Sequence, residues 1–241
     1  MRRDTPFVAG EFYHVFNRGA HKTDIFLEEK DYSRFLLLLH LANHSEGLNL
    51  RKVFATHHGL PLSSIFENET PDKSLVSIFA YCLMPNHFHL LLHQKSENGI
   101  TKFLKRVMTG YSMYFNVSRD HSGTIFQGPA KSKHIDGEEY FRYIFAYIHL
   151  NPLDLVEPGW KTERTLTKKE TRNFIHTYPY SSFYDFAVSK RPESAVLAYD
   201  SAPDFIREGN DFDDLARWYA SGDLLAELST VAKDSPLQRG G

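Results

Sequence analysis

The chain has very little cysteine: Cys82 is the only one among its 241 residues. A single thiol excludes an internal disulfide framework and any zinc site built from several cysteines. The first residues also lack the apolar stretch of a secretory signal peptide. The longest mainly apolar run, residues 35–41, is too short to span a bilayer. We therefore expect a cytoplasmic protein that has no membrane partner.

The chain also lacks a strong net charge, because 28 Lys and Arg residues are nearly balanced by 30 Asp and Glu residues. The two signs are nevertheless separated along the sequence. Residues 102–133 contain six basic residues and one acid, Asp120, whereas acids dominate residues 193–234. A basic stretch favours contact with phosphate groups, although it can equally be a solvated surface. The candidate phosphate-binding residues are Lys105, Arg106, Arg119, Lys131 and Lys133.

The length and a hydrophobic content of 41% are typical of one large folded domain, or of one domain with an appendage. We assign residues 1–186 to the main domain and residues 187–241 to an acidic C-terminal extension. Residues 44–73 contain several Gly and Pro residues and little periodicity, so no regular element is predicted there.

Hydrophobic periodicity predicts the order strand, helix, strand, strand, helix, strand, helix. The predicted strands cover residues 11–18, 75–81, 87–94 and 132–135. The predicted helices begin at Thr23 or Asp24 and end at Leu41, and then cover residues 98–117 and 137–151; a further helix is predicted at 211–228. This order favours an α+β sandwich, in which helices pack on an antiparallel sheet.

Two histidines, His87 and His89, stand two residues apart in the predicted strand at 87–94. Successive strand side chains point to opposite faces, so both imidazoles lie on one face of the sheet. The intervening Phe88, with Leu90 and Leu92, forms an apolar face that can be packed under helices. A pair of imidazoles on one face is a plausible platform for a divalent metal ion.

A stripe of polar side chains runs along the predicted helix at 137–151. Tyr143, Tyr147 and Asn151 are spaced four residues apart, and Pro152 is expected to end the helix at about Asn151. If this stripe faces the histidine strand, a phenol and a carboxamide oxygen come close to the metal. Judged by periodicity alone, the pattern favours tyrosines that only fill the core.

Together, the segments 81–89 (YCLMPNHFH) and 147–152 (YIHLNP) resemble the signatures of the REP-associated tyrosine transposases. These belong to the single-tyrosine branch of the HUH nucleases, named for a His-hydrophobic-His motif. Shorter matches follow the same order at residues 13–19 (YHVFNRG), 125–128 (IFQG) and 178–182 (YPYSS). The resemblance covers residues 10–186, and it implies a ferredoxin-like arrangement of the sheet and helices. It also implies that residues 44–73 are an insertion, because the family often joins these elements with a shorter link.

The resemblance implies that Tyr147 is the nucleophile, ahead of Tyr140 and Tyr143, and that His87, His89 and Asn151 bind Mg²⁺ or Mn²⁺. It also implies a DNA partner, single-stranded or folded as a hairpin, which is cleaved to a 5′-phosphotyrosine and a free 3′-hydroxyl. Monomers and homodimers both occur among such enzymes. His14 and His149 are assigned no role, and His93 is expected to face solvent or phosphate.

Three alternatives remain open at this stage. The first is a replication-initiator or relaxase-type nickase, which uses the same His-x-His and tyrosine chemistry. The second is a domesticated hairpin-DNA-binding protein without cleavage, which would not need both histidines and Tyr147. The third is an unrelated metallohydrolase, whose further ligands have no clear motif in this sequence.

Overall fold

The computed structural model describes residues 6–71, 73–163, 169–208 and 211–221. Within them, four strands form one antiparallel sheet in the order β2-β3-β1-β4. The strands are β1 (Phe12–Arg18), β2 (Val76–Met84), β3 (His87–Gln94) and β4 (Lys131–Ile135). Helices lie between β1 and β2 and again between β3 and β4, and the strand order is β2-β3-β1-β4. This is the ferredoxin-like topology, and the predicted α+β fold is confirmed.

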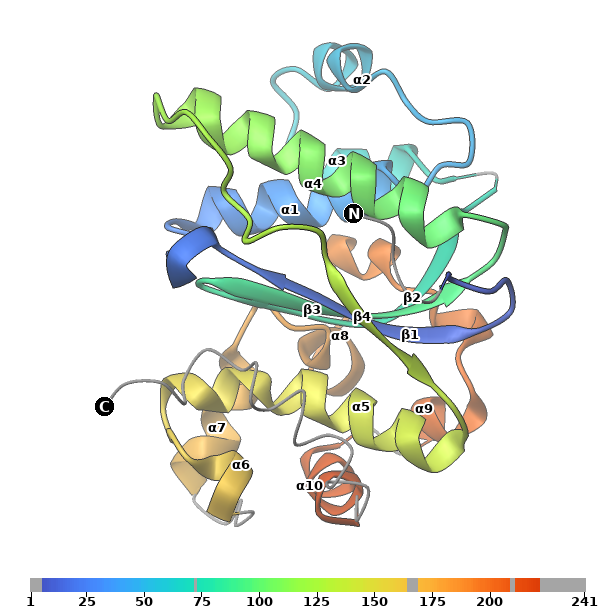
Figure 1. The fold of residues 1–241 in the computed structure, drawn as a ribbon, viewed down its shortest axis with the longest axis vertical. Helices are drawn as coiled ribbons and strands as arrows, with labels where there is room; N and C mark the ends of the chain where they lie inside the picture. Colours follow the sequence, from blue (N-terminus) through green and yellow to red (C-terminus); the bar gives the residue numbers. More distant parts are fainter. Residues whose placement is uncertain (1–5, 72, 164–168, 209–210, 222–241) are drawn as a thin grey trace.

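Helices cover both faces of the sheet (Figure 1). The helices in the first part of the chain are α1 (Glu29–Leu41), α2 (Leu50–Thr56), α3 (Ser63–Asn68), α4 (Gly99–Ser118) and α5 (Glu138–Leu150). Those that follow are α6 (Trp160–Glu163), α7 (Lys169–Thr177), α8 (Phe183–Ala187), α9 (Asp204–Glu208) and α10 (Phe212–Ser221). Short 3₁₀ turns cover Ala20–Lys22, Asn151–Leu155, Pro192–Val196 and Tyr199–Ser201. Among the described residues, every helix is too short or too polar to span a lipid bilayer.

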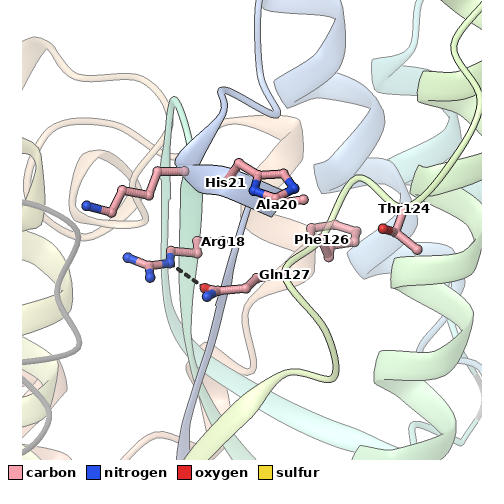
Figure 2. Close-up of a pocket in the computed structure, with 7 residues that line it drawn as sticks. Arg18, Ala20, His21, Thr124, Phe126 and Gln127 are labelled. Atoms are coloured by element: carbon pink, nitrogen blue, oxygen red, sulfur yellow. Dashed lines mark hydrogen bonds between the residues drawn. The ribbon is translucent and has the colours of Figure 1, made fainter.

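The end of β1 is tied to the loop that precedes β4. The backbone N–H of Gln127 donates to the carbonyl of Arg18 over 2.9 Å, and the Arg18 side chain reaches the Gln127 carboxamide (Figure 2). Gly19 forms an isolated bridge with Phe126. The two segments, more than a hundred residues apart in sequence, therefore form one surface at this end of the sheet.

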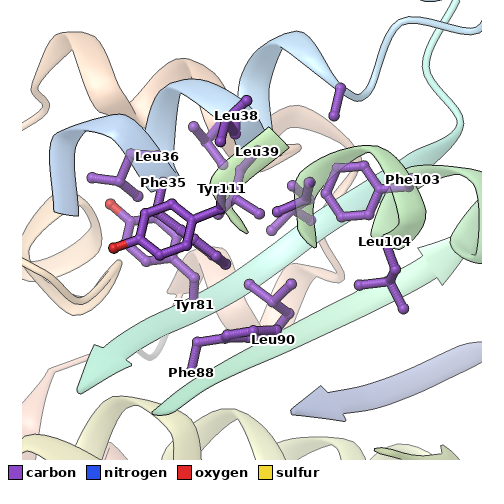
Figure 3. Close-up of a cluster of buried hydrophobic side chains, with 14 of the residues drawn as sticks. Phe35, Leu36, Leu38, Leu39, Tyr81, Phe88, Leu90, Phe103, Leu104 and Tyr111 are labelled. Atoms are coloured by element: carbon purple, nitrogen blue, oxygen red, sulfur yellow. The ribbon is translucent and has the colours of Figure 1, made fainter. Parts of the chain in front are cut away.

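The apolar face predicted for β3 packs under α1 and α4 (Figure 3). Phe88, Leu90 and Leu92 are fully buried there, against Phe35 of α1 and Phe103 of α4. Burying a side chain of this size stabilises the fold by roughly 1.5–3 kcal/mol. The opposite face, which carries the histidines, packs under α5, so that the sandwich has a helical layer on each side.

Helix α1 begins later than the sequence predicted, at Glu29 rather than Thr23 or Asp24. Glu28 caps its first turn, and the Asp31 carboxylate accepts hydrogen bonds from the backbone N–H groups of Leu27 and Glu28. This capping box satisfies donors that the first turn leaves free, and it fixes the start of the helix.

The segment predicted as an insertion contains α2 and α3. These helices have only 7 and 6 residues, too few for a helical period to stand out in the sequence. Val53, Ile65 and Phe66 nevertheless belong to the same buried apolar cluster as the side chains of α1. Whether the segment is an insertion stays a prediction.

In the predicted C-terminal extension, α10 packs against α5. Tyr219 stacks on Tyr143 with 5.3 Å between ring centroids, and Trp218 lies 6.1 Å from Phe145. The predicted helix at 211–228 is confirmed for Phe212–Ser221, while 222–228 lie outside the described residues. The domain boundary at residue 186 stays a prediction.

Candidate active site

The His-x-His pair opens strand β3 on the face covered by α5. In the sheet register, His87 lies opposite Arg18 and His89 lies opposite Phe16. The two imidazole centroids are 5.1 Å apart, and the ring planes are perpendicular. Both side chains are buried, at 8% and 6% exposure. The predicted placement of both rings on one face is confirmed by this register.

Each imidazole is oriented by a hydrogen bond at Nδ1. His87 Nδ1 donates to the Asn86 carboxamide oxygen over 2.6 Å, and His89 Nδ1 shares a hydrogen bond of 2.9 Å with His14 Nε2. Burial lowers the pKa of His87 to about 3, and the charges of Lys161 and Arg18 add to this effect. Burial also holds the pKa of His89 well below its usual value. Both rings are therefore neutral at pH 7, which keeps a lone pair available for a ligand.

His14 belongs to this cluster, although sequence reasoning gave it no role. Its ring stacks on His89 with 5.0 Å between centroids, and burial lowers its pKa to about 3. Its Nδ1 is buried without a hydrogen-bond partner in the described part of the chain. The strand alternation places His14 and Phe16 on one face, but only the register of β1 against β3 brings that face beside His89.

Of the three candidate nucleophiles on α5, Tyr147 lies against the histidines. Its ring centroid is 5.5 Å from that of His89 and 5.8 Å from that of His14. Tyr143 is instead buried between Tyr147 and Tyr219, and burial, followed by Tyr219, raises the pKa of its phenol. Tyr140 stacks on Tyr143, one helical turn further from the site. The geometry favours Tyr147.

Asn151 is fully buried at the end of α5 and already has two partners. Its Nδ2 donates to the Tyr147 carbonyl over 2.7 Å, and its Oδ1 accepts from Lys161 Nζ over 3.3 Å. The amide therefore closes the last turn of the helix, as an Asn at this position commonly does. A carboxamide oxygen has a second lone pair, so these contacts leave room for one more partner.

Lys161, from the short helix α6, is a site residue that the sequence did not reveal. Its Nζ donates to Asp154 Oδ2 over 2.6 Å and lies 5.1 Å from the Tyr147 ring centroid. Burial opposes its charge, but Tyr147 and Asp154 outweigh burial, so the pKa of the ammonium is raised. The site thus holds a fixed positive charge beside the candidate nucleophile. No spacing signal connects residue 161 to the two motifs.

The basic residues predicted to bind phosphate divide between the two faces of the sheet. In the register of β1 with β4, Lys131 pairs with Phe16 and Lys133 with His14, so both lysines share the histidine face. Lys131 is exposed and Lys133 is half-buried.

Lys105, Arg106 and Arg119 instead come from α4 and the residue after it, in the opposite layer (Figure 1). Arg106 donates to the carbonyls of Ala42, His44 and Ser45. Arg119 forms ion pairs with Asp31 and Glu28. These two guanidinium groups hold the fold together, and their contact with DNA stays a prediction.

His93, the third histidine on this strand face, lies away from the pair. It is half-buried opposite Phe12, with ring centroids 4.8 Å apart. His149, on α5, shares a hydrogen bond of 2.6 Å with the Ser182 hydroxyl and is fully buried. Neither ring is in contact with His87 or His89, so both lie outside the candidate site.

The donor set fits a divalent metal ion only in part. In the described residues, no three His, Cys, Asp or Glu side chains gather as a complete metal site. The two histidines keep their Nε2 atoms free of hydrogen bonds to the described residues, and their Nδ1 atoms are held by Asn86 and His14. Second partners of this kind orient metal-binding imidazoles in proteins. A neutral amide, water and substrate oxygens would have to supply the remaining ligands.

Residues 48–151 match the family model described as IS200-like transposase. The match contains His87, His89, Tyr147 and Asn151, but neither His14 nor Lys161. No curated protein sequence matches the chain. Among solved structures, one described as the REP-associated tyrosine transposase bound to a REP hairpin is similar, with 14% identity and a TM-score of 0.44. That similarity covers 77% of this chain and 84% of the other chain.

Proposed function

We propose that this chain, whose residues 48–151 match the model of the IS200-like transposase family, is a metal-dependent endonuclease and strand transferase that acts on single-stranded or hairpin DNA. The family match supports a transposase. The observation that carries the finer proposal is the position of Tyr147, whose ring lies against the rings of His89 and His14.

His87, His89 and Asn151 would hold the Mg²⁺ or Mn²⁺ ion. When bound, such an ion withdraws charge from the non-bridging oxygens of a phosphodiester and stabilises a departing alkoxide. The protein keeps the two imidazoles neutral by burial and orients them through Asn86 and His14.

In the proposed cleavage step, the Tyr147 oxygen attacks phosphorus and the bond from phosphorus to the 3′ oxygen breaks. One phosphodiester is exchanged for another, so no external energy source is needed. The products are a 5′-phosphotyrosine and a free 3′-hydroxyl, which takes up a proton.

Tyrosine ordinarily loses its proton near pH 10, so the reaction needs a group that favours the phenolate. Lys161 supplies a positive charge beside the ring and is itself held by Asp154. This arrangement supports Tyr147 as the attacking group rather than as core packing alone.

DNA contact is proposed for Lys131 and Lys133, because they share the face of His14 and His89. A DNA strand bound on this face of the sheet would reach the histidine pair and both lysines at once. Contact through Lys105, Arg106 and Arg119 requires DNA to reach the opposite layer. A DNA partner is compatible with the cytoplasmic location expected from the sequence, and association as a homodimer stays open.

The test is a single-turnover assay with DNA strands labelled at either end, as hairpins and as unstructured strands, with Mn²⁺, Mg²⁺ or EDTA. Denaturing electrophoresis is expected to show a metal-dependent adduct that retains the 3′-end label, while the 5′-labelled fragment is released. Tyr147→Phe should abolish the adduct, and Tyr143→Phe, one turn away, should retain it. DNA binding without an adduct under every metal condition would instead support the non-cleaving DNA-binding protein.

A further inference from the structure

A cavity of about 450 Å³ lies at the end of β1 (Figure 2). Its walls come from the turn after β1 and from the loop before β4. The lining residues are Arg18, Ala20, His21, Lys22, Thr124, Phe126 and Gln127. We call this cavity the turn pocket. Cavities that bind small ligands have volumes of about 300–1,000 Å³, so one nucleotide is a suitable occupant.

Backbone hydrogen bonds make the turn pocket a preformed feature. Ala20 N–H donates to the Ile125 carbonyl and Gln127 N–H donates to the Arg18 carbonyl, both over 2.9 Å. At Gly19 no larger residue fits, because an added Cβ would lie 2.0 Å from the Thr23 carbonyl oxygen. The two walls are therefore fixed relative to each other before any ligand arrives.

The turn itself contains two residues in the left-handed backbone region. His21 has φ 53° and Lys22 has φ 65°, and neither is glycine. Each such residue costs on the order of 1 kcal/mol or more, and strain of this kind concentrates at functional sites. Here the strained residues bring two side chains that can carry positive charge to the wall of one pocket.

The lining chemistry suits a nucleotide. Arg18, His21 and Lys22 are basic, and the lining contains no acidic residue. Arg18 Nε donates to Gln127 Oε1, so the guanidinium keeps further N–H groups for a phosphate. Gln127 retains its NH₂ group as a donor for a base edge, and Phe126 contributes an aromatic surface.

The pocket is connected to the candidate metal site through Asn86. The Asn86 side chain accepts a hydrogen bond from His87 Nδ1 and donates one to the Lys22 backbone carbonyl. The backbone carbonyl of Asn86 accepts a hydrogen bond from the Gly19 N–H group. Arg18 and His87 are also direct neighbours in the sheet register. A phosphate in the turn pocket is therefore adjacent to a phosphodiester held at His87.

We propose that the turn pocket binds the nucleotide next to the cleaved phosphodiester in single-stranded DNA. In this arrangement Arg18 and Lys22 hold its phosphate, and Phe126 and Gln127 contact its base. The proposal rests on the proposed function, because it places the scissile phosphate at His87. It assigns to these residues the choice of where the strand is cut.

The test measures equilibrium binding of labelled DNA in the Tyr147→Phe background, so that no cleavage intervenes. Each nucleotide that flanks the mapped cleavage site is replaced in turn by an abasic nucleotide. One abasic position is expected to weaken binding about tenfold, the effect of losing one stacked base. Gln127→Ala should weaken binding of intact DNA by a similar factor, with little further loss at that abasic position. Lys190→Met, which removes a cation over the distant Tyr199 ring, serves as the control.

Additive losses at every abasic position would overturn the proposal, because contact between two groups requires non-additivity. The proposal would also be overturned if the four deoxynucleoside 5′-monophosphates displaced the labelled DNA as effectively as the unlabelled DNA strand does. That result would identify a free nucleotide as the ligand of the pocket. In both cases the cleavage assay with unmodified Tyr147 still reports separately whether the proposed function holds. Cleavage without a covalent adduct there, with the binding pattern intact, would retain the pocket and refute the transferase.

Discussion

Replacing Arg119 by Met should destabilise the protein rather than weaken its contact with DNA. Arg119 Nη2 donates to Asp31 Oδ2 over 2.6 Å and to Glu28 Oε1 over 2.9 Å. Asp31 is fully buried, and the Arg119 side chain is only 16% exposed. The substitution would leave a buried carboxylate without its cation.

The structure sets the size of the effect. Removing one partner of a buried ion pair costs about 3–5 kcal/mol. Asp31 keeps three other donors, the backbone N–H groups of Leu27 and Glu28 and the Tyr114 hydroxyl. We therefore expect a loss of about 2 kcal/mol in the free energy of unfolding, since each retained hydrogen bond offsets part of the cost. For a chain of this size the melting temperature falls by about 4–8 °C.

The assay combines thermal unfolding with DNA binding measured over a range of salt concentrations. A phosphate contact contributes about 0.7–0.9 to the slope of log affinity against log salt, depending on strand form. Arg119→Met is expected to leave that slope unchanged at temperatures where it is folded. Lys133→Met, which changes a half-buried lysine on the histidine face, should lower the slope and change the melting temperature little. An unchanged melting temperature for Arg119→Met together with a lower salt slope would refute this reasoning.

Two further predictions concern the buried histidines and the end of α5. His14, His87 and His149 have pKa values lowered to about 3, so the unfolded state binds more protons than the folded state between pH 6.5 and 3. The free energy of unfolding therefore has its full value above pH 6.5. Below pH 6.5 it decreases, by up to about 2 kcal/mol per histidine at pH 5. A free energy of unfolding from urea titration that stays constant from pH 7.5 to 5 would contradict this. Asn151→Ala should reduce cleavage and lower the melting temperature, because the buried amide closes α5 and holds Lys161. Partial rescue of its cleavage by higher Mn²⁺ would support a ligand role, and no rescue would leave Asn151 as a helix-end residue only.

The strand at 87–94 and the helix at 137–151 were predictable because each has a clear period. Alternation put His87 and His89 on one face, and helical spacing aligned Tyr143, Tyr147 and Asn151 on one stripe. Pro152 marked the end of α5, which the structure places at Leu150. Such local signals fix which face a side chain occupies, but not what lies opposite it.

The partners of these residues depend on long-range packing. His14 reaches His89 through the register of β1, and Lys161 reaches Tyr147 through the path of the chain after α5. Charge counting likewise could not separate Arg106 and Arg119, which hold the protein's own carbonyls and carboxylates, from Lys133 on the histidine face. The start of α1 was missed because the N-cap is Glu28. Thr and Asp are more common N-cap residues than Glu, so the sequence pointed to Thr23 or Asp24 instead.

The central claim is that Tyr147 is the nucleophile, and the most direct measurement is the identification of the modified residue by peptide mass spectrometry. The protein would be incubated with cleavable DNA and Mn²⁺, the adduct trimmed with a nuclease, and the peptides that cover α5 sequenced. A nucleotide mass attached through phosphate to Tyr147 is predicted. The same mass on Tyr143 or Tyr140, or on a residue outside α5, would contradict the account.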